Sequence, residues 1–268
     1  MGSKKPTEIE MLGRLNDREL LKNYCHFAGI HRANVADSLF RSLSGAGENQ
    51  RRSTGLELLG NLVATLEDAA MWFFVLKEWK KGNALLFDLL DTTNIQERPG
   101  GPMSSEAVLN EIAGWTIADL RREFGLPRDE DLLKRGWTET MLNKHINDLR
   151  ADLDAFKSAL EMRTEDERTM VNSYNKIKHG ALAIATTEHS SINVSVMLPS
   201  RRGPVDPISG KRKINFAWIA CEDKALRSLV NITIQTSFVL WWILNILYVA
   251  RFDPDWKFPP WPYTISEG

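Results

Sequence analysis

The chain has few cysteines, almost no net charge and none of the glycine-rich patterns that mark common nucleotide-binding enzymes. Among its 268 residues are two cysteines, Cys25 and Cys221, which exclude a disulfide framework and show no paired spacing for zinc. Its 34 basic and 35 acidic side chains give a net charge of −1, so no global field attracts nucleic acid or membrane. The chain has no Walker, GxGxxG or GxSxG pattern, which disfavours ATPases, dehydrogenases and α/β hydrolases. We expect no metal and no cofactor.

The hydrophobic stretches are short or interrupted by polar residues. Residues 1–12 contain no apolar core of signal-peptide length, so we expect a cytoplasmic protein with reduced thiols. Residues 229–250 carry no charge over 22 positions, which is long enough to span a membrane. Their polar side chains would each need a partner in lipid, so we predict a helix buried in a bundle and no membrane span. These polar residues are Asn231, Thr233, Gln235, Thr236, Ser237 and Asn245.

Apolar residues recur at helical spacing through most of the chain, and its 43% hydrophobic and 26% charged content is typical of soluble globular proteins. The first predicted helix begins at Asp17 after Asn16, a suitable N-cap, and runs to about Leu43. A second predicted helix begins at Thr54 and stops near Gly82. The remaining predicted elements are loops over 44–53 and 92–104 and helices over 83–91, 105–127 and 222–251.

The most regular helical pattern lies at 142–160, where apolar residues are spaced 4, 3, 4, 3 and 4 apart. Thr164 and Glu167 then have the spacing of a capping box, in which the hydroxyl and the carboxylate satisfy free amides at a helix start. A new helix is therefore predicted over 165–182, antiparallel to the preceding one. The apolar residues of the pattern are Leu142, Ile146, Leu149, Leu153, Phe156 and Leu160.

After residue 190 the apolar period changes to alternation, over 191–198 and again over 213–221, which predicts a β-hairpin over 191–221. The tail over 252–268 is rich in proline and tryptophan. We predict that it is extended and docks on its own chain, although an aromatic groove of a partner could also bind it. The predicted fold class is mainly α, a helical bundle with one late β-hairpin insertion. Its predicted parts are a helical arm and loop over 1–53, a bundle over 54–251 and the tail.

A polar stripe lies on the helix predicted over 165–182. Four polar residues follow one another at spacings of 4, 3 and 4, which places them on one helical face. The last of them is a histidine in the final turn, where carbonyl dipoles favour the charged imidazole. The stripe consists of Arg168, Asn172, Asn175 and His179, and Lys176 and Lys178 add positive charge within one turn.

The segment YNKIKHG, residues 174–180, resembles the signature of the HEPN superfamily (higher eukaryotes and prokaryotes nucleotide-binding), especially bacterial forms linked to RNA cleavage and phage defence. That signature is an arginine, most often followed by asparagine, with a histidine four to six residues after the arginine. The resemblance implies a HEPN-like bundle and a metal-independent ribonuclease of toxin or defence type, with the site formed across a homodimer. Asn175 matches the family's asparagine, and His179 matches the histidine that takes part in proton transfer or orients the 2′-hydroxyl.

Tyr174 stands where the family has its phosphate-stabilising arginine. Arg168 cannot replace that arginine within the same helix, because 11 residues put it about 16 Å from His179 along the axis. Glu67, on an early helix, resembles the acidic residues that often face the motif in this family. Two interpretations stay open: an RNA-binding or RNA-cleaving effector, and a non-catalytic module for dimerisation or partner docking, in which Asn175 and His179 form a polar cluster that closes the helix end.

The chain between the two predicted strands is a second candidate site. Residues 200–213 carry five basic and one acidic side chain, a net charge of +4. Such a patch attracts the phosphate backbone without reading sequence, and it also fits a solvated loop whose charges protect a β-edge from aggregation. The residues predicted to bind RNA are Arg201, Arg202, Lys211 and Arg212 here, and Arg168, Lys176 and Lys178 beside the motif.

Overall fold

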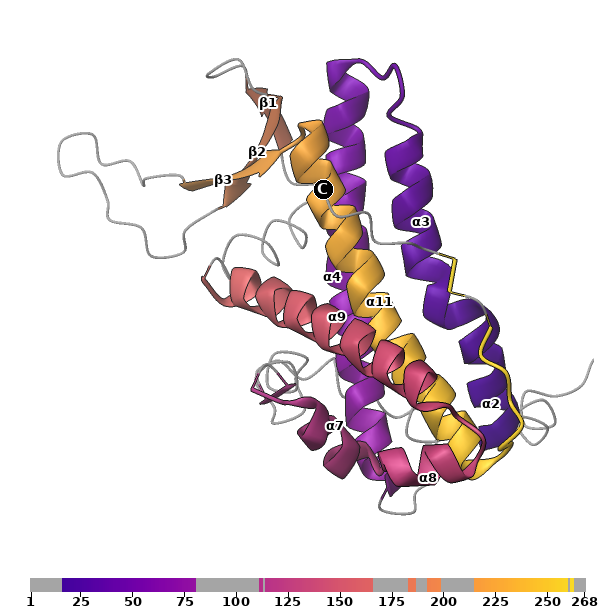
Figure 1. Cartoon of the computed structure of the whole chain (residues 1–268). Coiled ribbons are helices and arrows are strands. Elements are labelled where there is room, and N and C mark those ends of the chain that lie inside the picture. Colours follow the sequence, from indigo (N-terminus) through magenta and orange to yellow (C-terminus); the bar gives the residue numbers. More distant parts are fainter. Residues whose placement is uncertain are drawn as a thin grey trace, which may run out of the picture. The chain divides into compact units, whose positions relative to one another are not determined.

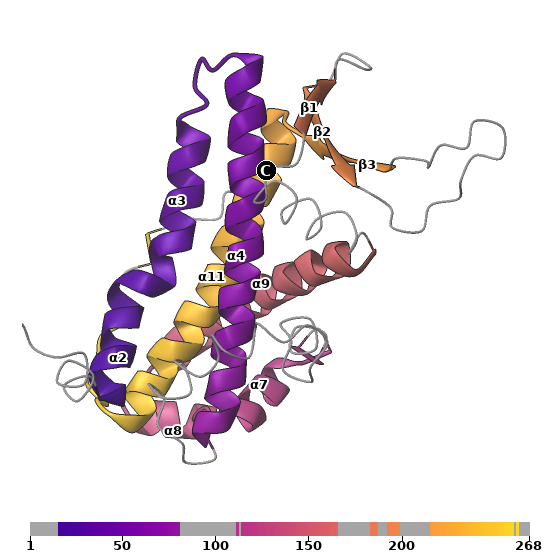
Figure 2. The ribbon, with the colours of Figure 1, turned by 180° about the vertical axis from the view of Figure 1, so that it is seen from behind.

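The chain is mainly α-helical, with a small antiparallel sheet late in the sequence, in a computed structural model (Figures 1 and 2). The predicted fold class is therefore confirmed. The structure describes residues 16–80, 111–112, 114–165, 183–186, 192–198, 215–259 and 261–262.

The chain divides into two compact units, each assembled from three segments. Helices α4 (Glu48–Lys80), α9 (Glu139–Glu165) and α11 (Asp223–Arg251) contribute residues to both units. These units group the chain differently from the predicted arm, bundle and tail. Unit 1 comprises 1–31, 67–154 and 236–264, and unit 2 comprises 32–66, 155–235 and 265–268.

The first predicted helix is present but not continuous. Helix α2 (Asp17–Asn23) begins as predicted, because the Asn16 side chain accepts a hydrogen bond from the backbone amide of Glu19 at 2.9 Å. A π-helical turn, η1 (Tyr24–Ala28), then separates α2 from α3 (Gly29–Arg41). In this turn the Cys25 carbonyl accepts a hydrogen bond from the Trp241 indole at 3.1 Å. Because that partner is more than 200 residues away, local periodicity could not predict the turn.

Helix α4 begins at Glu48, so the predicted loop over 44–53 is wrong in its second half. An ion pair stabilises this additional helical turn, because the Arg52 guanidinium lies 3.0 Å from the Glu48 carboxylate one turn earlier. Arg52 also donates from Nε to the backbone carbonyl of Asn193 at 3.2 Å. The rest of α4 follows the prediction, because its apolar residues are buried: Leu59, Leu62, Leu66, Phe73 and Leu76.

The helix predicted over 105–127 is interrupted before Thr116. Thr116 and Asp119 form a capping box that starts helix α7 (Ile117–Phe124), and Gly125 ends it with a left-handed φ of 67°. The short helix α8 (Asp129–Lys134) follows. The apolar spacing on either side of Thr116 is compatible with one continuous helix, so periodicity alone does not predict this interruption.

Helix α9 follows the apolar spacing predicted at 142–160, with Leu142, Leu149, Leu153 and Phe156 buried. The helix continues to Glu165, so Thr164 lies inside its last turn. The prediction that Thr164 is the N-cap of a new helix is therefore wrong, since an N-cap has a non-helical backbone. Residues 166–182 lie outside the described part of the chain.

The predicted β-hairpin is confirmed as the pair β2 (Asn193–Leu198) and β3 (Asn215–Ala220), which run antiparallel. A third strand, β1 (Ala183–Thr186), was not predicted; it pairs with β2, so the strand order is β1-β2-β3. Four residues are too few for alternation to be visible in the sequence.

Among the described residues, two helices are long and apolar enough to cross a membrane, Glu48–Lys77 and Asp223–Arg251. In their most apolar windows 67% and 89% of the residues are buried inside the structure. Core helices of soluble proteins have the same property, so these helices are weak evidence for a membrane protein.

The described part of the tail has no regular helix or strand after Phe252, and it docks in unit 1. The Trp256 indole donates to Asn245 Oδ1 at 3.0 Å, and its ring lies 4.6 Å from the ring of Tyr248. The Trp261 ring lies 5.2 Å from that of Trp241. Docking of the tail on its own chain is thus confirmed for these residues.

Candidate functional site

Most predicted site residues lie outside the described part of the chain, including Tyr174 at the motif's arginine position. Glu67 is the one predicted site residue within that part; it is exposed on α4 and forms interactions of its own. The predicted residues outside are Asn175, His179, Arg168, Lys176, Lys178, Arg201, Arg202, Lys211 and Arg212.

A buried carboxyl group on α9 is the most perturbed acid among the described residues. Asp152 is 3% exposed, and no hydrogen-bond partner of its Oδ1 atom occurs in the described structure. Burial, and then the negative charge of Asp148 one turn earlier, raise the pKa of Asp152 to about 7. The carboxyl group of Asp152 therefore changes between its neutral and its charged form near neutral pH.

His145 precedes Asp148 by three residues and Asp152 by seven, so these three titratable residues share one face of α9. The His145 ring lies 5.2 Å from Trp137 and 5.7 Å from Phe258. Burial between such rings lowers the pKa of His145, which favours the neutral imidazole. Across the described residues, no group of three His, Cys, Asp or Glu side chains could hold a metal ion.

The chemistry of Asp152 suits proton transfer, but its position does not suit catalysis. A general acid or base must come within hydrogen-bond reach of the substrate. A side chain that is 3% exposed offers almost no surface to a dissolved substrate. We therefore assign to Asp152 an effect on the pH dependence of stability.

Unit 2 holds one end of its sheet firmly against α4. The bond from Arg52 to the Asn193 carbonyl links β2 to α4. Within the sheet, the Cys221 amide donates to the Ile192 carbonyl at 2.7 Å and so continues the pairing of β2 with β3. The Cys221 thiol contacts Gly55 so closely that a Cβ atom there would lie 2.7 Å from the sulfur. A side chain at position 55 would therefore force the Cys221 thiol to move. Burial raises the pKa of this thiol to about 11, so it stays protonated.

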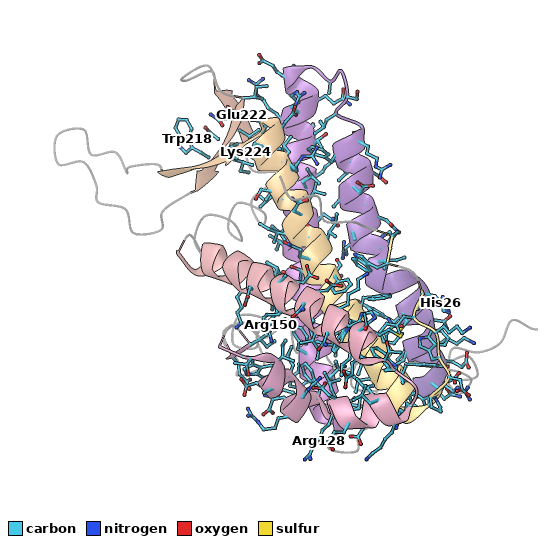
Figure 3. The ribbon with its side chains drawn as sticks, in the orientation of Figure 1. His26, Arg128, Arg150, Trp218, Glu222 and Lys224 are labelled. Carbon is cyan, nitrogen blue, oxygen red and sulfur yellow. The ribbon has the colours of Figure 1, made fainter. Side chains whose placement is uncertain are left out.

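The same sheet presents a large aromatic side chain to solvent. Trp218, on the edge strand β3, is 51% exposed, and its ring projects beyond the strand ribbons in Figure 3. The residue opposite it on β2 is Ser195, which is 2% exposed. Within the described structure no ring or cation stacks on the Trp218 indole.

Sequence reasoning missed both Asp152 and Trp218. Asp152 lies three residues after Leu149 and four before Phe156, so a carboxylate on the apolar face was a visible signal. The alternation over 213–221 places Trp218 on the same strand face as Ile214 and Phe216, which predicts an apolar, covered face. Alternation distinguishes the two faces of a strand, but it does not show which face another element covers.

The chain matches no protein-family model, no curated protein and no solved structure. The HEPN superfamily therefore remains a resemblance carried by residues 174–180.

Proposed function

We propose that this protein is a HEPN-like effector that binds RNA and cleaves it without metal, with Asn175 and His179 at its site. The observation that carries the proposal is the segment YNKIKHG, which places these two residues four positions apart. Lys176 and Lys178 supply positive charge beside them, as binding of a phosphate backbone requires. The mainly α-helical bundle is the fold expected for such a protein.

In the proposed reaction the 2′-oxygen attacks the neighbouring phosphorus, and the bond from phosphorus to the 5′-oxygen breaks. The products are a 2′,3′-cyclic phosphate and a 5′-hydroxyl. The proton lost by the 2′-hydroxyl is balanced by the proton that the leaving 5′-oxygen gains, so no water is consumed. His179 takes the proton of the 2′-hydroxyl or orients that group, because an imidazole titrates near neutral pH. The Asn175 amide can donate to a phosphate oxygen.

A second candidate function is a non-catalytic module for dimerisation or partner docking. The observation that favours it is Tyr174 at the position of the family's arginine, since a tyrosine carries no positive charge for the phosphate. In this alternative Asn175 and His179 close a helix end through hydrogen bonds. Loss of His179 then leaves polar partners unsatisfied and costs about 1–3 kcal/mol of stability.

The decisive experiment compares His179→Ala with the wild-type protein, using labelled RNA in the presence of a metal chelator. The proposal expects a stable variant whose cleavage rate falls about 10²–10⁴-fold, and expression of which no longer degrades total RNA or inhibits growth. His31→Ala is the matched control, because His31 is exposed on α3 and outside the motif. A destabilised variant of a protein that never cleaved RNA would favour the non-catalytic module.

The substitution Tyr174→Arg tests whether the family's site is otherwise complete. We expect weak cleavage by the wild-type protein, and a higher rate once arginine stands before Asn175. Adding His179→Ala should abolish that gain. A folded Tyr174→Arg protein without cleavage, or one that cannot fold, would contradict the catalytic proposal.

A further inference from the structure

We propose that the C-terminal tail is a strap that detaches from the helices of unit 1 when His145 becomes protonated. The strap consists of the described residues 252–259 and 261–262, which turn back after α11 and run beside α2 (Figures 1 and 2). The inference goes beyond the proposed function and does not rest on it, because it uses only contacts within unit 1.

The central anchor of the strap is Phe258. Its ring centroid lies 5.5 Å from that of Trp137, 5.7 Å from that of His145 and 5.8 Å from that of Trp241. These three rings come from the connection between α8 and α9, from α9 itself and from α11. One of the three rings that hold the strap is therefore an imidazole, the side chain whose charge ordinarily changes near neutral pH.

The surface beneath the strap is held by bonds that do not involve the strap. Arg135, before α9, donates to the Val249 carbonyl of α11 at 2.8 Å. The Trp241 indole is fixed by its bond to the Cys25 carbonyl. The strap itself has no regular helix or strand after Phe252. It is therefore the part of this contact that can detach while the helices stay folded.

The bound strap makes the charged form of His145 costly. The ring is half-buried, and its Nδ1 atom is buried with no hydrogen-bond partner among the described residues. Both nitrogens of a charged imidazole carry a proton, so Nδ1 would become a donor without an acceptor. Burial is the largest effect on the pKa of His145 and lowers it, while the charge of Asp148 raises it and that of Lys144 lowers it.

The other elements packed around His145 supply no charge that shifts its pKa. Helix α11 carries no charged residue between Arg227 and Arg251. The charged residues beside Trp137 and in the strap are not among the groups that act on His145. These residues are Arg135, Glu139, Asp253, Asp255 and Lys257.

A second histidine contacts the strap and provides a comparison. The His26 ring lies 5.1 Å from that of Trp256, and His26 is exposed. Water can hydrate a charge on His26 while the strap stays bound, whereas a charge on His145 is hydrated only after Phe258 leaves. We therefore assign the effect of acid to His145 and not to His26.

Acid favours detachment because the pKa of His145 is lower when the strap is bound. After detachment water reaches the ring, and the pKa of His145 returns toward its ordinary value of about 6.5. Binding of the strap is then strongest above about pH 6.5 and weakens by up to about tenfold per pH unit below it, down to the pKa of the bound form. Detachment uncovers Trp241, which is 3% exposed beneath Phe258 and Trp261.

The experiment measures trypsin cleavage of the full-length protein between pH 5.5 and pH 7.5. Lys257 is the only Lys or Arg after Arg251, so cleavage there releases residues 258–268, which mass spectrometry detects. A synthetic peptide of residues 252–268, cleaved at each pH, corrects for the pH dependence of the protease. The ratio of the two initial rates follows the detached fraction, and we expect it to rise about three- to tenfold from pH 7.5 to pH 5.5.

Four variants assign the rise to its cause. His145→Phe keeps a ring that cannot be charged, so its ratio should stay low at every pH. His145→Gln is a second uncharged variant, used together with the first in case the larger ring disturbs folding. His26→Phe is the matched control and should keep the wild-type rise. Phe258→Ala removes the anchor and should give a high ratio at every pH.

Several results would overturn the inference. The wild-type ratio could be equal at pH 5.5 and pH 7.5, or both uncharged variants of His145 could show the full wild-type rise. A rise that coincides with loss of the helical circular dichroism signal would mean unfolding of unit 1 instead of detachment. A flat profile for His26→Phe would assign the acid response to His26.

Discussion

The nine tryptophans divide unequally between the two units, with eight in unit 1 and only Trp218 in unit 2. The eight are buried or half-buried, whereas Trp218 is exposed. Trp241 illustrates the first group, because it donates to the Cys25 carbonyl at 3.1 Å and its ring lies 5.2 Å from that of Trp261. Unit 1 uses its indoles to join segments distant in sequence, while unit 2 leaves its one indole available for contact.

The contrast extends to hydrogen bonds. In unit 1, Trp256 donates to Asn245, and Asn245 in turn donates to the Trp241 carbonyl at 2.8 Å. Asn245 is fully buried, so both ends of its amide are satisfied within the protein. This chain of bonds holds the tail, α11 and the π-helical turn together. A side chain with such partners has a structural role, and its loss should be felt in stability.

The largest expected effect on stability comes from Trp241→Ala. Removing a buried tryptophan leaves a cavity and deprives the Cys25 carbonyl of its partner, so unfolding free energy should fall by about 3–5 kcal/mol. Denaturant melts of Trp241→Ala and Trp218→Ala, measured side by side, test the comparison. Similar losses for both variants would show that Trp218 is also a structural residue.

Asp152 gives the next largest effect, and it depends on pH. Its pKa is about 7 in the folded chain and about 3.9 when unfolded, so the folded state binds its proton more tightly. The stability from this group is present below about pH 4 and is lost, by about 1.4 kcal/mol per pH unit, as the pH rises to about 7. Asp152→Asn should remove this loss and be more stable than the wild-type protein at pH 8.

Chemical denaturation of the two proteins from pH 4 to pH 8 measures the difference. Asp148→Asn is the matched control, because it removes the exposed neighbour and should lower the pKa of Asp152 without removing the buried group. Parallel curves for wild-type protein and Asp152→Asn would show that Asp152 is not buried as a neutral acid.

A third prediction sharpens the contrast by removing charge from unit 2. Neutral substitution of the five basic residues over 200–213 should weaken RNA binding and flatten its dependence on salt, since fewer counterions are released. For a single strand, each lost phosphate contact reduces the magnitude of the negative slope of log K against log salt by about 0.7. An unchanged slope would remove this segment from RNA binding. The residues are Arg201, Arg202, Lys211, Arg212 and Lys213.

The smallest effect is expected for Thr164→Ala. A cap would cost about 1 kcal/mol on removal, but Thr164 lies within α9, where alanine has the higher helix propensity. The melting temperature should therefore stay the same or rise slightly. A drop that matches the loss of a cap would place a helix start at Thr164 after all.

The amino-acid pattern was sufficient wherever structure depends on neighbours close in the chain. Asn16 as a cap, the buried stripe of α9 and the pair β2–β3 all follow from spacing, because a helix face or a strand face repeats with a fixed period. The resemblance at residues 174–180 was also visible at this level, since a motif is a local arrangement of residue types.

Tertiary structure decided the features whose partners are distant. The π-helical turn at Cys25 involves Trp241, the early start of α4 brings Arg52 to Asn193, and the pKa of Asp152 depends on burial. The same holds for Trp218, whose alternation in β3 is ordinary but whose exposure depends on what covers the sheet. Burial is a property of the assembled chain, because the solvent that a side chain loses is displaced by segments remote in sequence.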